Sequence, residues 1–388
     1  MTSLAGVLPP VAIGARVLRS FGAIVVAAVA LRLCVYAWMA LPYGGLVQAM
    51  CNFDCGWYER IALSGYDADA NWANLGSYPH WAFFPLYPLG VAVLHQALEI
   101  SARASGMLLS SLCLCGLAVL GARHLQSTRR YAHAVLWLIV LLLFPYSFLF
   151  SAVYTEALFA VLSAASLLAL ARRQVLLAAA LAAFVSATRP TGVVLTVIIA
   201  VDRLCALWRG RHRRDRVALL AQAALPFAVA PLGLFMYMLE QYIRIGDALA
   251  FSHVQMLWNR RWGDPFARIG SAMTTLDFGG LLMLPSHAYE ASFAAVGLLG
   301  AAWLAYRRRG AEAAFLAGCI LLPAATGVDS LPRFVSTNPV FLYLVYDLAA
   351  AALLPVARPM LLGGFAAVLA GLQALLLIGW YTGAGGVF

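Results

Sequence analysis

The run FGAIVVAAVALRLCVYAWMAL, residues 21–41, indicates the fold class because its length matches the hydrocarbon core of a bilayer. It is too long for the apolar core of a signal peptide, and no clear cleavage site follows it. We therefore expect a first membrane-spanning helix. Arg16 and Arg19 precede it, and their retention in the cytoplasm would place the loop at residues 42–82 outside.

The composition extends this prediction to the whole chain. Hydrophobic residues make up 63% of the 388 residues and charged residues 11%, whereas soluble domains have about 45–50% and about 25%. The net charge is +10 and every basic residue is Arg, but these residues gather at the ends of apolar segments. That distribution is typical of topology signals and does not predict nucleic-acid binding. Further apolar segments cover residues 84–101, 105–121, 133–152, 154–171, 174–188, 191–208, 217–239, 288–306, 312–328, 339–356 and 359–380.

The Arg clusters predict the orientation of these segments. Placing residues 129–130, 172–173, 209–216 and 307–309 inside gives regular alternation from residue 123 onward. Three complete spans before Arg123 would break that alternation, so we expect 84–101 to be surface-lying or re-entrant.

The result is one transmembrane domain over residues 1–388, all-α and polytopic, with about eleven spans. Its long external loops are residues 42–82 and 241–285. Eleven of the 16 acids then lie outside or at external helix ends: Asp54, Glu59, Asp67, Asp69, Glu156, Glu240, Asp247, Asp264, Asp277, Glu290 and Asp329.

Asp54 heads a short amphipathic stretch in the first external loop. An acid before such a stretch and Gly65 after it predict a juxtamembrane helix with Asp54 as its N-cap. The same carboxylate could act as a general base, and the two roles are compatible. Cys51 and Cys55 flank it and could pair in an oxidising compartment. A spacing of four suits one helical turn poorly for a disulfide, so we expect free thiols. No His lies at zinc-ligand spacing, so no metal site is expected.

Glu156 and Arg189 interrupt apolar sequence at two further external turns. Glu156 lies in PYSFLFSAVYTEALF, where it either complements a helix dipole or is a functional acid at membrane depth. Arg189 lies in SATRPTG, where it is either an interfacial side chain that snorkels to water or a phosphate ligand. The residues alone leave both pairs of alternatives open.

Two more external turns carry Arg residues. The segment GDALAFSHVQMLWNRRWGDPF suits an interfacial aromatic belt, and it equally suits a lipid phosphate beside a sugar stacked on an aromatic ring. The segment DSLPRF carries another Arg between two apolar spans. Because three separate turns place Arg at the same membrane face, we expect one shared site. Its candidates from these two turns are His253, Gln255, Trp258, Arg260, Arg261 and Arg333.

In this order, the motifs resemble the PIG-V family of mannosyltransferases, within the GT-C superfamily of polyprenyl-phosphate-sugar-dependent glycosyltransferases. The resemblance covers roughly residues 20–345, and Phe53 and Cys55 depart from it where Trp and a small residue are expected. The motifs that carry it are FDCGWYERIALSGY, AFFPLYP, PYSFLFSAVYTEALF, ATRPTG, GDALAFSHVQMLWNRRW and LPRF.

The resemblance implies a GT-C-type bundle and an inverting transfer of mannose, or a related hexose, from a polyprenyl-phosphate donor to an acceptor hydroxyl. It implies no cofactor and no nucleotide sugar. Asp54 becomes the general base. The implied donor-phosphate ligands are Arg189, Arg260, Arg261 and Arg333, with Glu156, His253, Gln255 and Trp258 as further substrate-binding residues.

The acceptor and the location follow from composition. A chain without Lys that is rich in Ala and Leu suggests a bacterium with a GC-rich genome, and bacteria do not make GPI. We expect a lipid-linked or cell-envelope glycan as acceptor, and a site that faces the periplasm or exterior from the inner membrane. The alternatives are a lipid or glycan transporter or flippase, or a non-catalytic membrane subunit. Transporters often show internal repeats and charges midway along helices, which this sequence does not.

Overall fold

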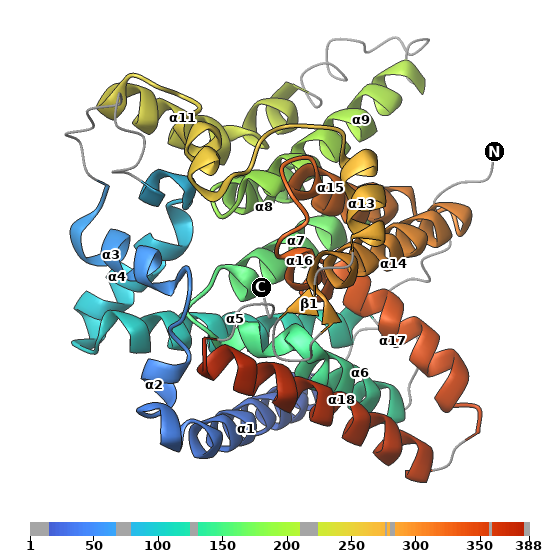
Figure 1. The fold of residues 1–388 in the computed structure, drawn as a ribbon. Helices are drawn as coiled ribbons and strands as arrows, with labels where there is room; N and C mark the ends of the chain where they lie inside the picture. Colours follow the sequence, from blue (N-terminus) through green and yellow to red (C-terminus); the bar gives the residue numbers. More distant parts are fainter. Residues whose placement is uncertain are drawn as a thin grey trace.

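The computed structural model of the protein is predominantly helical (Figure 1). It describes residues 15–66, 79–124, 131–209, 224–275, 278–279, 284–356 and 359–383. Six helices in these ranges are long and apolar enough to cross a membrane: Phe21–Met39, Ala102–Ala122, Pro190–Trp208, Ala224–Ile245, His287–Tyr306 and Pro359–Tyr381. The fold is therefore consistent with the predicted all-α polytopic membrane protein. The count of about eleven spans stays a prediction, because five further apolar helices have only 10–17 residues.

In the first half of the chain, short helical elements separate the longer helices. Its elements are α1 (Ala15–Met39), η1 (Leu41–Tyr43), α2 (Leu46–Ala49), α3 (Cys55–Ser64), η3 (Pro79–Ala82), α4 (Leu86–Leu98), α5 (Ala102–His124), α6 (Tyr131–Leu143), η4 (Pro145–Ser151), α7 (Glu156–Ala171), α8 (Val175–Ser186), η5 (Pro190–Gly192) and α9 (Val193–Arg209).

The second half contains a small two-stranded antiparallel pairing between its helices. Its elements are α11 (Leu232–Ile245), α12 (Ala250–His253), η6 (Val254–Trp258), α13 (Pro265–Thr274), β1 (Phe278–Gly279), β2 (Leu284–Pro285), α14 (Ser286–Tyr306), α15 (Gly310–Ala324), α16 (Leu331–Ser336), α17 (Pro339–Leu353) and α18 (Pro359–Tyr381).

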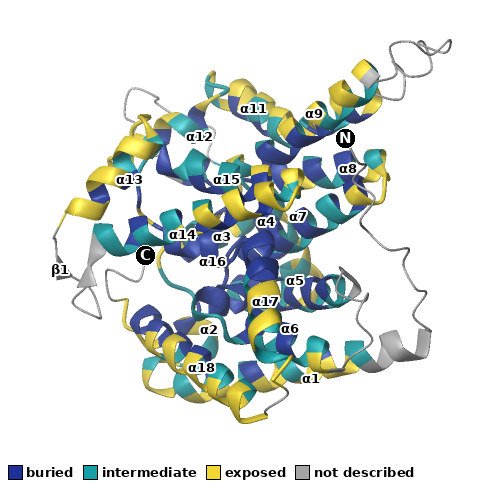
Figure 2. Cartoon of the chain, turned by 90° about the vertical axis from the view of Figure 1, so that its right-hand side faces the viewer, coloured by how far each residue is buried: buried dark blue, intermediate teal, exposed yellow. Residues whose placement is uncertain are grey.

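Large apolar side chains cover the outside of the long helices. Figure 2 shows buried residues gathered in the middle of the molecule, with exposed ones along the outer helices. Trp38, Ile243, Leu299 and Met360 are 71–88% exposed. Soluble monomers rarely expose so much apolar surface, so these faces suit contact with lipid chains.

The predicted continuous segment at 133–152 is broken at Pro145. Helix α6 ends at Leu143, and η4 continues at an angle of 81°. Proline lacks a backbone N–H and its ring displaces the preceding turn, which explains the break. Gln373 of α18 lies beside it, and its Nε2 donates to Leu142 O at 3.0 Å and to Phe144 O at 2.8 Å. A neighbouring helix therefore satisfies carbonyls that the break releases.

Two other predicted boundaries can be compared with the structure. Helix α4 has 13 residues and spans about 20 Å, less than the roughly 30 Å of a bilayer core. Its length thus agrees with the expectation that 84–101 does not cross alone. Helix α11 continues to Ile245, beyond the end of the apolar segment at residue 239. An ion pair between Glu240 and Arg244 supports the extra turn, and Gly246 at φ 73° ends it.

Some predicted features fall outside the described residues. They are Asp67, Asp69, Asp277, the Arg pair at 129–130 and the Arg run from 210 to 216.

Candidate active site

Four predicted residues form a continuous chain of alternating charge, here called the charge chain. An oxygen of Asp54 lies 3.4 Å from Arg333 Nη1, and Arg333 Nε lies 3.4 Å from Glu156 Oε1. Glu156 is also ion-paired with Arg189. These side chains come from segments that lie far apart in the sequence. The fold brings them together, and in the sequence only the predicted membrane topology related them.

Glu156 is at the centre of the charge chain and is almost completely buried. It is the first residue of α7, where a carboxylate complements the helix dipole. It also pairs with two guanidinium groups, so the helix dipole alone does not account for its surroundings.

Arg189 occupies an extended position between α8 and η5. Its side chain is only 14% exposed, and its Nε donates to Thr155 Oγ1 at 2.6 Å. The side chain therefore points into the protein, and the snorkelling interpretation is wrong.

Aromatic rings enclose both arginines. Arg333 lies over the rings of Tyr154 and Phe334, at 5.4 and 4.8 Å from their centres. Arg189 lies over the rings of Phe159 and Phe334, at 5.5 and 5.4 Å from their centres. Phe334 thus contacts both guanidinium groups, and the faces of these rings stabilise the largely buried cations.

Arg333 is firmly charged in this position. Burial by itself disfavours the cation, but the Glu156 and Asp54 carboxylates outweigh it and raise the pKa of Arg333 above its ordinary value. A fixed positive charge therefore lies directly beside the Asp54 carboxylate.

Asp54 precedes α3, but the prediction that its side chain caps the helix is wrong. The carboxylate makes no capping hydrogen bond, and the residue has φ −68° and ψ −12° rather than the extended conformation of an ordinary N-cap. The backbone N–H of Asp54 instead donates to the Tyr154 hydroxyl at 2.8 Å. The side chain is 32% exposed, which leaves one face of the carboxylate open. The predicted stop at Gly65 is confirmed.

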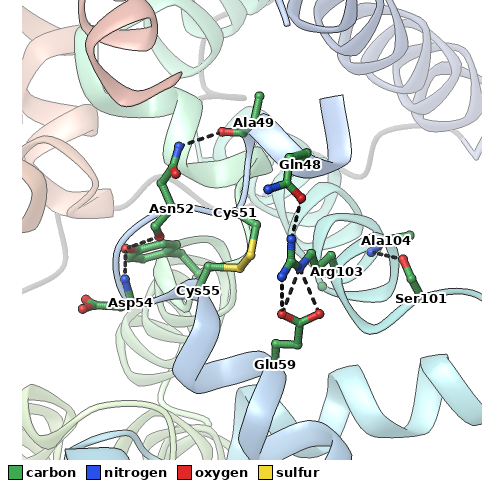
Figure 3. Close-up of a disulfide and its surroundings, with 12 residues drawn as sticks. Gln48, Ala49, Cys51, Asn52, Asp54, Cys55, Glu59, Ser101, Arg103 and Ala104 are labelled. Carbon is green, nitrogen blue, oxygen red and sulfur yellow. Dashed lines mark hydrogen bonds and ion pairs between the residues drawn. A yellow bond between two sulfur atoms is a disulfide. The ribbon is translucent and has the colours of Figure 1, made fainter. Parts of the chain in front are cut away.

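Cys51 and Cys55 form a disulfide, so the prediction of free thiols is wrong (Figure 3). Their Cα atoms are 5.1 Å apart, within the range that a disulfide can bridge. The spacing argument assumed a regular helical turn. Phe53 instead has φ 50°, and this left-handed residue turns the chain just before α3 begins.

Arg260 lies near the charge chain and is half-buried. Its guanidinium has no hydrogen bond or ion pair with another described residue. Burial lowers the pKa of Arg260, and the nearby Asp329 carboxylate acts in the opposite direction. An arginine at this depth is still protonated at neutral pH, so its donors are available to an anion.

The other candidates from the 246–266 segment have local partners. His253 Nδ1 lies 2.6 Å from Asp247 Oδ2, and Gln255 donates to Phe251 O at 3.4 Å. Arg261 is exposed. None of these contacts joins His253, Gln255 or Arg261 to the charge chain within the described part of the protein.

Trp258 extends from this segment toward the end of the loop predicted at residues 42–82. Its ring meets Phe83 edge-on at 6.3 Å, and Phe83 stacks on Trp57 of α3 at 6.2 Å. Trp258 therefore belongs to an aromatic group beside α3 rather than to the charge chain itself.

Sequence reasoning did not select Tyr154, Thr155 and Phe334. Tyr154 fixes the backbone at Asp54, Thr155 accepts from Arg189, and Phe334 lies under both arginines. A signal was present, because each lies within two residues of a selected residue, Glu156 or Arg333.

Within the described ranges, no group of three or more His, Cys, Asp or Glu side chains is arranged to hold a metal ion. No protein-family model matches the chain, and a search of curated proteins finds no match. The resemblance to the PIG-V family therefore depends on the ordered motifs alone.

Proposed function

We propose that the protein is a GT-C-type membrane glycosyltransferase. It transfers mannose or a related hexose, with inversion, from a polyprenyl-phosphate donor to a hydroxyl of a lipid-linked or cell-envelope glycan. The observation that carries the proposal is the open face of the Asp54 carboxylate next to a cluster of arginines. Such a pairing offers a base to the acceptor and cations to the departing phosphate.

In the proposed step, Asp54 takes the proton of the acceptor hydroxyl as that oxygen forms a bond to the sugar C1. The bond between C1 and the phosphate oxygen breaks, and its electron pair remains on the phosphate. A base on the opposite face from the leaving group gives inversion, by analogy with inverting glycosidases. No covalent intermediate with the protein forms.

The leaving polyprenyl phosphate gains negative charge, which guanidinium groups can stabilise. Arg189 and Arg333 already have Glu156 and Asp54 as partners, and the two acids balance the two arginines. Arg260 has uncommitted donors. We therefore assign the main phosphate contact to Arg260. The charge chain positions the Asp54 carboxylate and determines the electrostatic potential around it.

The test is a transfer assay with purified protein, polyprenyl-phosphate-mannose and candidate lipid acceptors. The proposal predicts equal amounts of released polyprenyl phosphate and mannosylated acceptor. A transporter or flippase would instead move the intact lipid between the leaflets of a vesicle without releasing phosphate, and that result would overturn the proposal.

The proposed orientation has a separate test. Ser64 at the end of α3 is exposed, so Ser64→Cys offers a labelling site in the first external loop. A membrane-impermeant maleimide added to spheroplasts should label this variant. Labelling only after the membrane is opened would place the loop in the cytoplasm and contradict the proposed orientation.

A further inference from the structure

The disulfide closes a ring of five residues around Asp54. Cys55 is the buried first residue of α3, and Cys51 follows α2, so the bond joins the two helices across the loop. Figure 3 shows the Asp54 carboxylate pointing away from the sulfur atoms. The disulfide therefore constrains the loop without blocking the carboxylate.

Hydrogen bonds fix the same loop from two other directions. The Asn52 side-chain amide donates to Ala49 O at 3.2 Å and to Trp380 O at 2.7 Å. The Tyr154 hydroxyl donates to Asn52 O at 3.2 Å while it accepts from Asp54 N at 2.8 Å. The backbone on both sides of Phe53 is thus held by α18 and by the turn before α7.

Phe53 is in a conformation that needs such support. Its φ of 50° is uncommon for a residue with a bulky side chain, and left-handed residues of this kind persist only when their surroundings hold them. Its ring packs against Trp380 at 5.2 Å. The turn at Phe53 is also the reason that Asp54 enters α3 without the extended backbone of an N-cap.

The observed position of Asp54 differs from the one that an Asp before a helix ordinarily adopts. In the observed position its carboxylate pairs with Arg333 and is 32% exposed. In the other, the backbone relaxes to extended geometry and the carboxylate accepts from N–H groups in the first turn of α3, as an Asp in this place ordinarily does. A constraint on the loop selects between the two.

We propose that the Cys51–Cys55 disulfide is a redox-dependent clamp that holds Asp54 off the helix cap and in its reacting position. This inference rests on the proposed function, because it takes Asp54 to be the base. Forming the clamp removes two protons and two electrons from two thiols, and a protein disulfide donor of an oxidising compartment accepts them by thiol–disulfide exchange. A small dithiol reverses the reaction and becomes a cyclic disulfide.

The experiment compares oxidised and dithiothreitol-reduced full-length protein in lipid nanodiscs, after mass spectrometry has established the state of each cysteine. We expect reduction to lower kcat by about tenfold or more, because small displacements of a catalytic group are costly. The KM for polyprenyl-phosphate-mannose should change by less than about twofold, because the donor contacts lie elsewhere.

Variants separate the clamp from other effects of the reductant. The double variant Cys51→Ser/Cys55→Ser should have the low kcat of the reduced wild type, with or without dithiothreitol. Reoxidation of the reduced wild-type protein should restore its original kcat. Cys34→Ser is the matched control, since it removes an exposed free thiol and leaves the disulfide intact. It should behave as the wild type does.

Hydrogen exchange gives a readout that does not require activity. Reduction should speed exchange at residues 51–54 and slow it in the first turn of α3, because the carboxylate then caps that turn. If the oxidised protein transfers no sugar but reduction still changes the exchange in this way, the proposed function fails and the structural clamp stands. If kcat and exchange are the same in both redox states, or if mass spectrometry finds free thiols in protein from an oxidising compartment, the clamp proposal is overturned.

Discussion

Arg333 and Arg32 are both buried guanidinium groups, but their partners are of different kinds. Arg333 lies between two carboxylates, Asp54 and Glu156. Arg32 of α1 has no ion pair with a described carboxylate; it donates to the Tyr36 hydroxyl and to the carbonyl of Ser147. One arginine belongs to a chain of full charges, and the other belongs to a network of neutral groups.

The second group, here called the carbonyl network, consists of Arg32 and its neutral partners Tyr36, Ser147 and Gln373. It surrounds the break at Pro145, and α1 and α18, which supply its donors, lie side by side in Figure 1. Its evident role is to satisfy the backbone where α6 stops.

The charge chain has a different character. It reaches a partly exposed carboxylate, and no broken helix explains its acids. Burial of a charge therefore does not by itself indicate a functional site. An open carboxylate at the end of a buried, balanced ion-pair chain is the more specific signal.

The largest effect on stability is expected for Glu156→Gln. This variant removes the charge that compensates two buried arginines, which should cost about 3–5 kcal/mol of unfolding free energy. Thermal unfolding in detergent measures it. Glu59→Gln is the matched control, since Glu59 pairs with Arg103 in a partly exposed position and should cost about 1 kcal/mol or less. Equal losses would contradict the distinction between the two pairs.

A smaller loss is expected when the carbonyl network is cut. Gln373→Leu removes one donor to Leu142 O and Phe144 O, and it removes the acceptor of the buried Tyr36 hydroxyl. Leaving a buried polar group of this kind unsatisfied costs about 1–3 kcal/mol. Hydrogen exchange should rise near residues 142–147, while donor affinity stays unchanged. A variant that retains its stability but no longer binds the donor would assign a ligand role to this network.

Arg260→Gln should act on binding rather than on stability. Hydrogen bonds to charged groups contribute about 1.5–3 kcal/mol, so donor affinity should fall roughly tenfold to a hundredfold. Isothermal titration with polyprenyl-phosphate-mannose measures the change. Arg261→Gln, at the exposed neighbouring position, is the control and should change affinity less than about twofold. Similar losses in both variants would remove the special role of Arg260.

The smallest effect is expected for His253→Gln. The pair that His253 makes with Asp247 is exposed, and such pairs contribute about 0–1 kcal/mol. Stability and kcat should both stay near the wild-type values. A large loss of kcat with normal stability would return His253 to the site.

Membrane topology predicted the assembly of the charge chain well. Asp54, Glu156, Arg189 and Arg333 were each assigned to an external turn, and turns on one membrane face of a bundle can meet. The partners inside each turn were harder to select, because Tyr154 and Thr155 look like ordinary residues at a helix start.

The disulfide and the helix break were harder still. The left-handed conformation of Phe53 brings Cys51 and Cys55 together. A Phe at this position does not predict a left-handed backbone. The apolar sequence continues through Pro145, so hydrophobicity suggested one segment where the backbone makes a sharp bend. Both misses are backbone geometries that tertiary contacts stabilise.

The most direct test of the central claim is the rate of polyprenyl-phosphate release by Asp54→Asn. The substitution keeps the size of the side chain and removes its basicity, so release should fall by about 10²–10⁴-fold. Donor affinity should remain close to that of the wild type. The unfolding temperature should fall less than in Glu156→Gln, because the Asp54 side chain is 32% exposed. Release at the wild-type rate would contradict the assignment of Asp54 as the base.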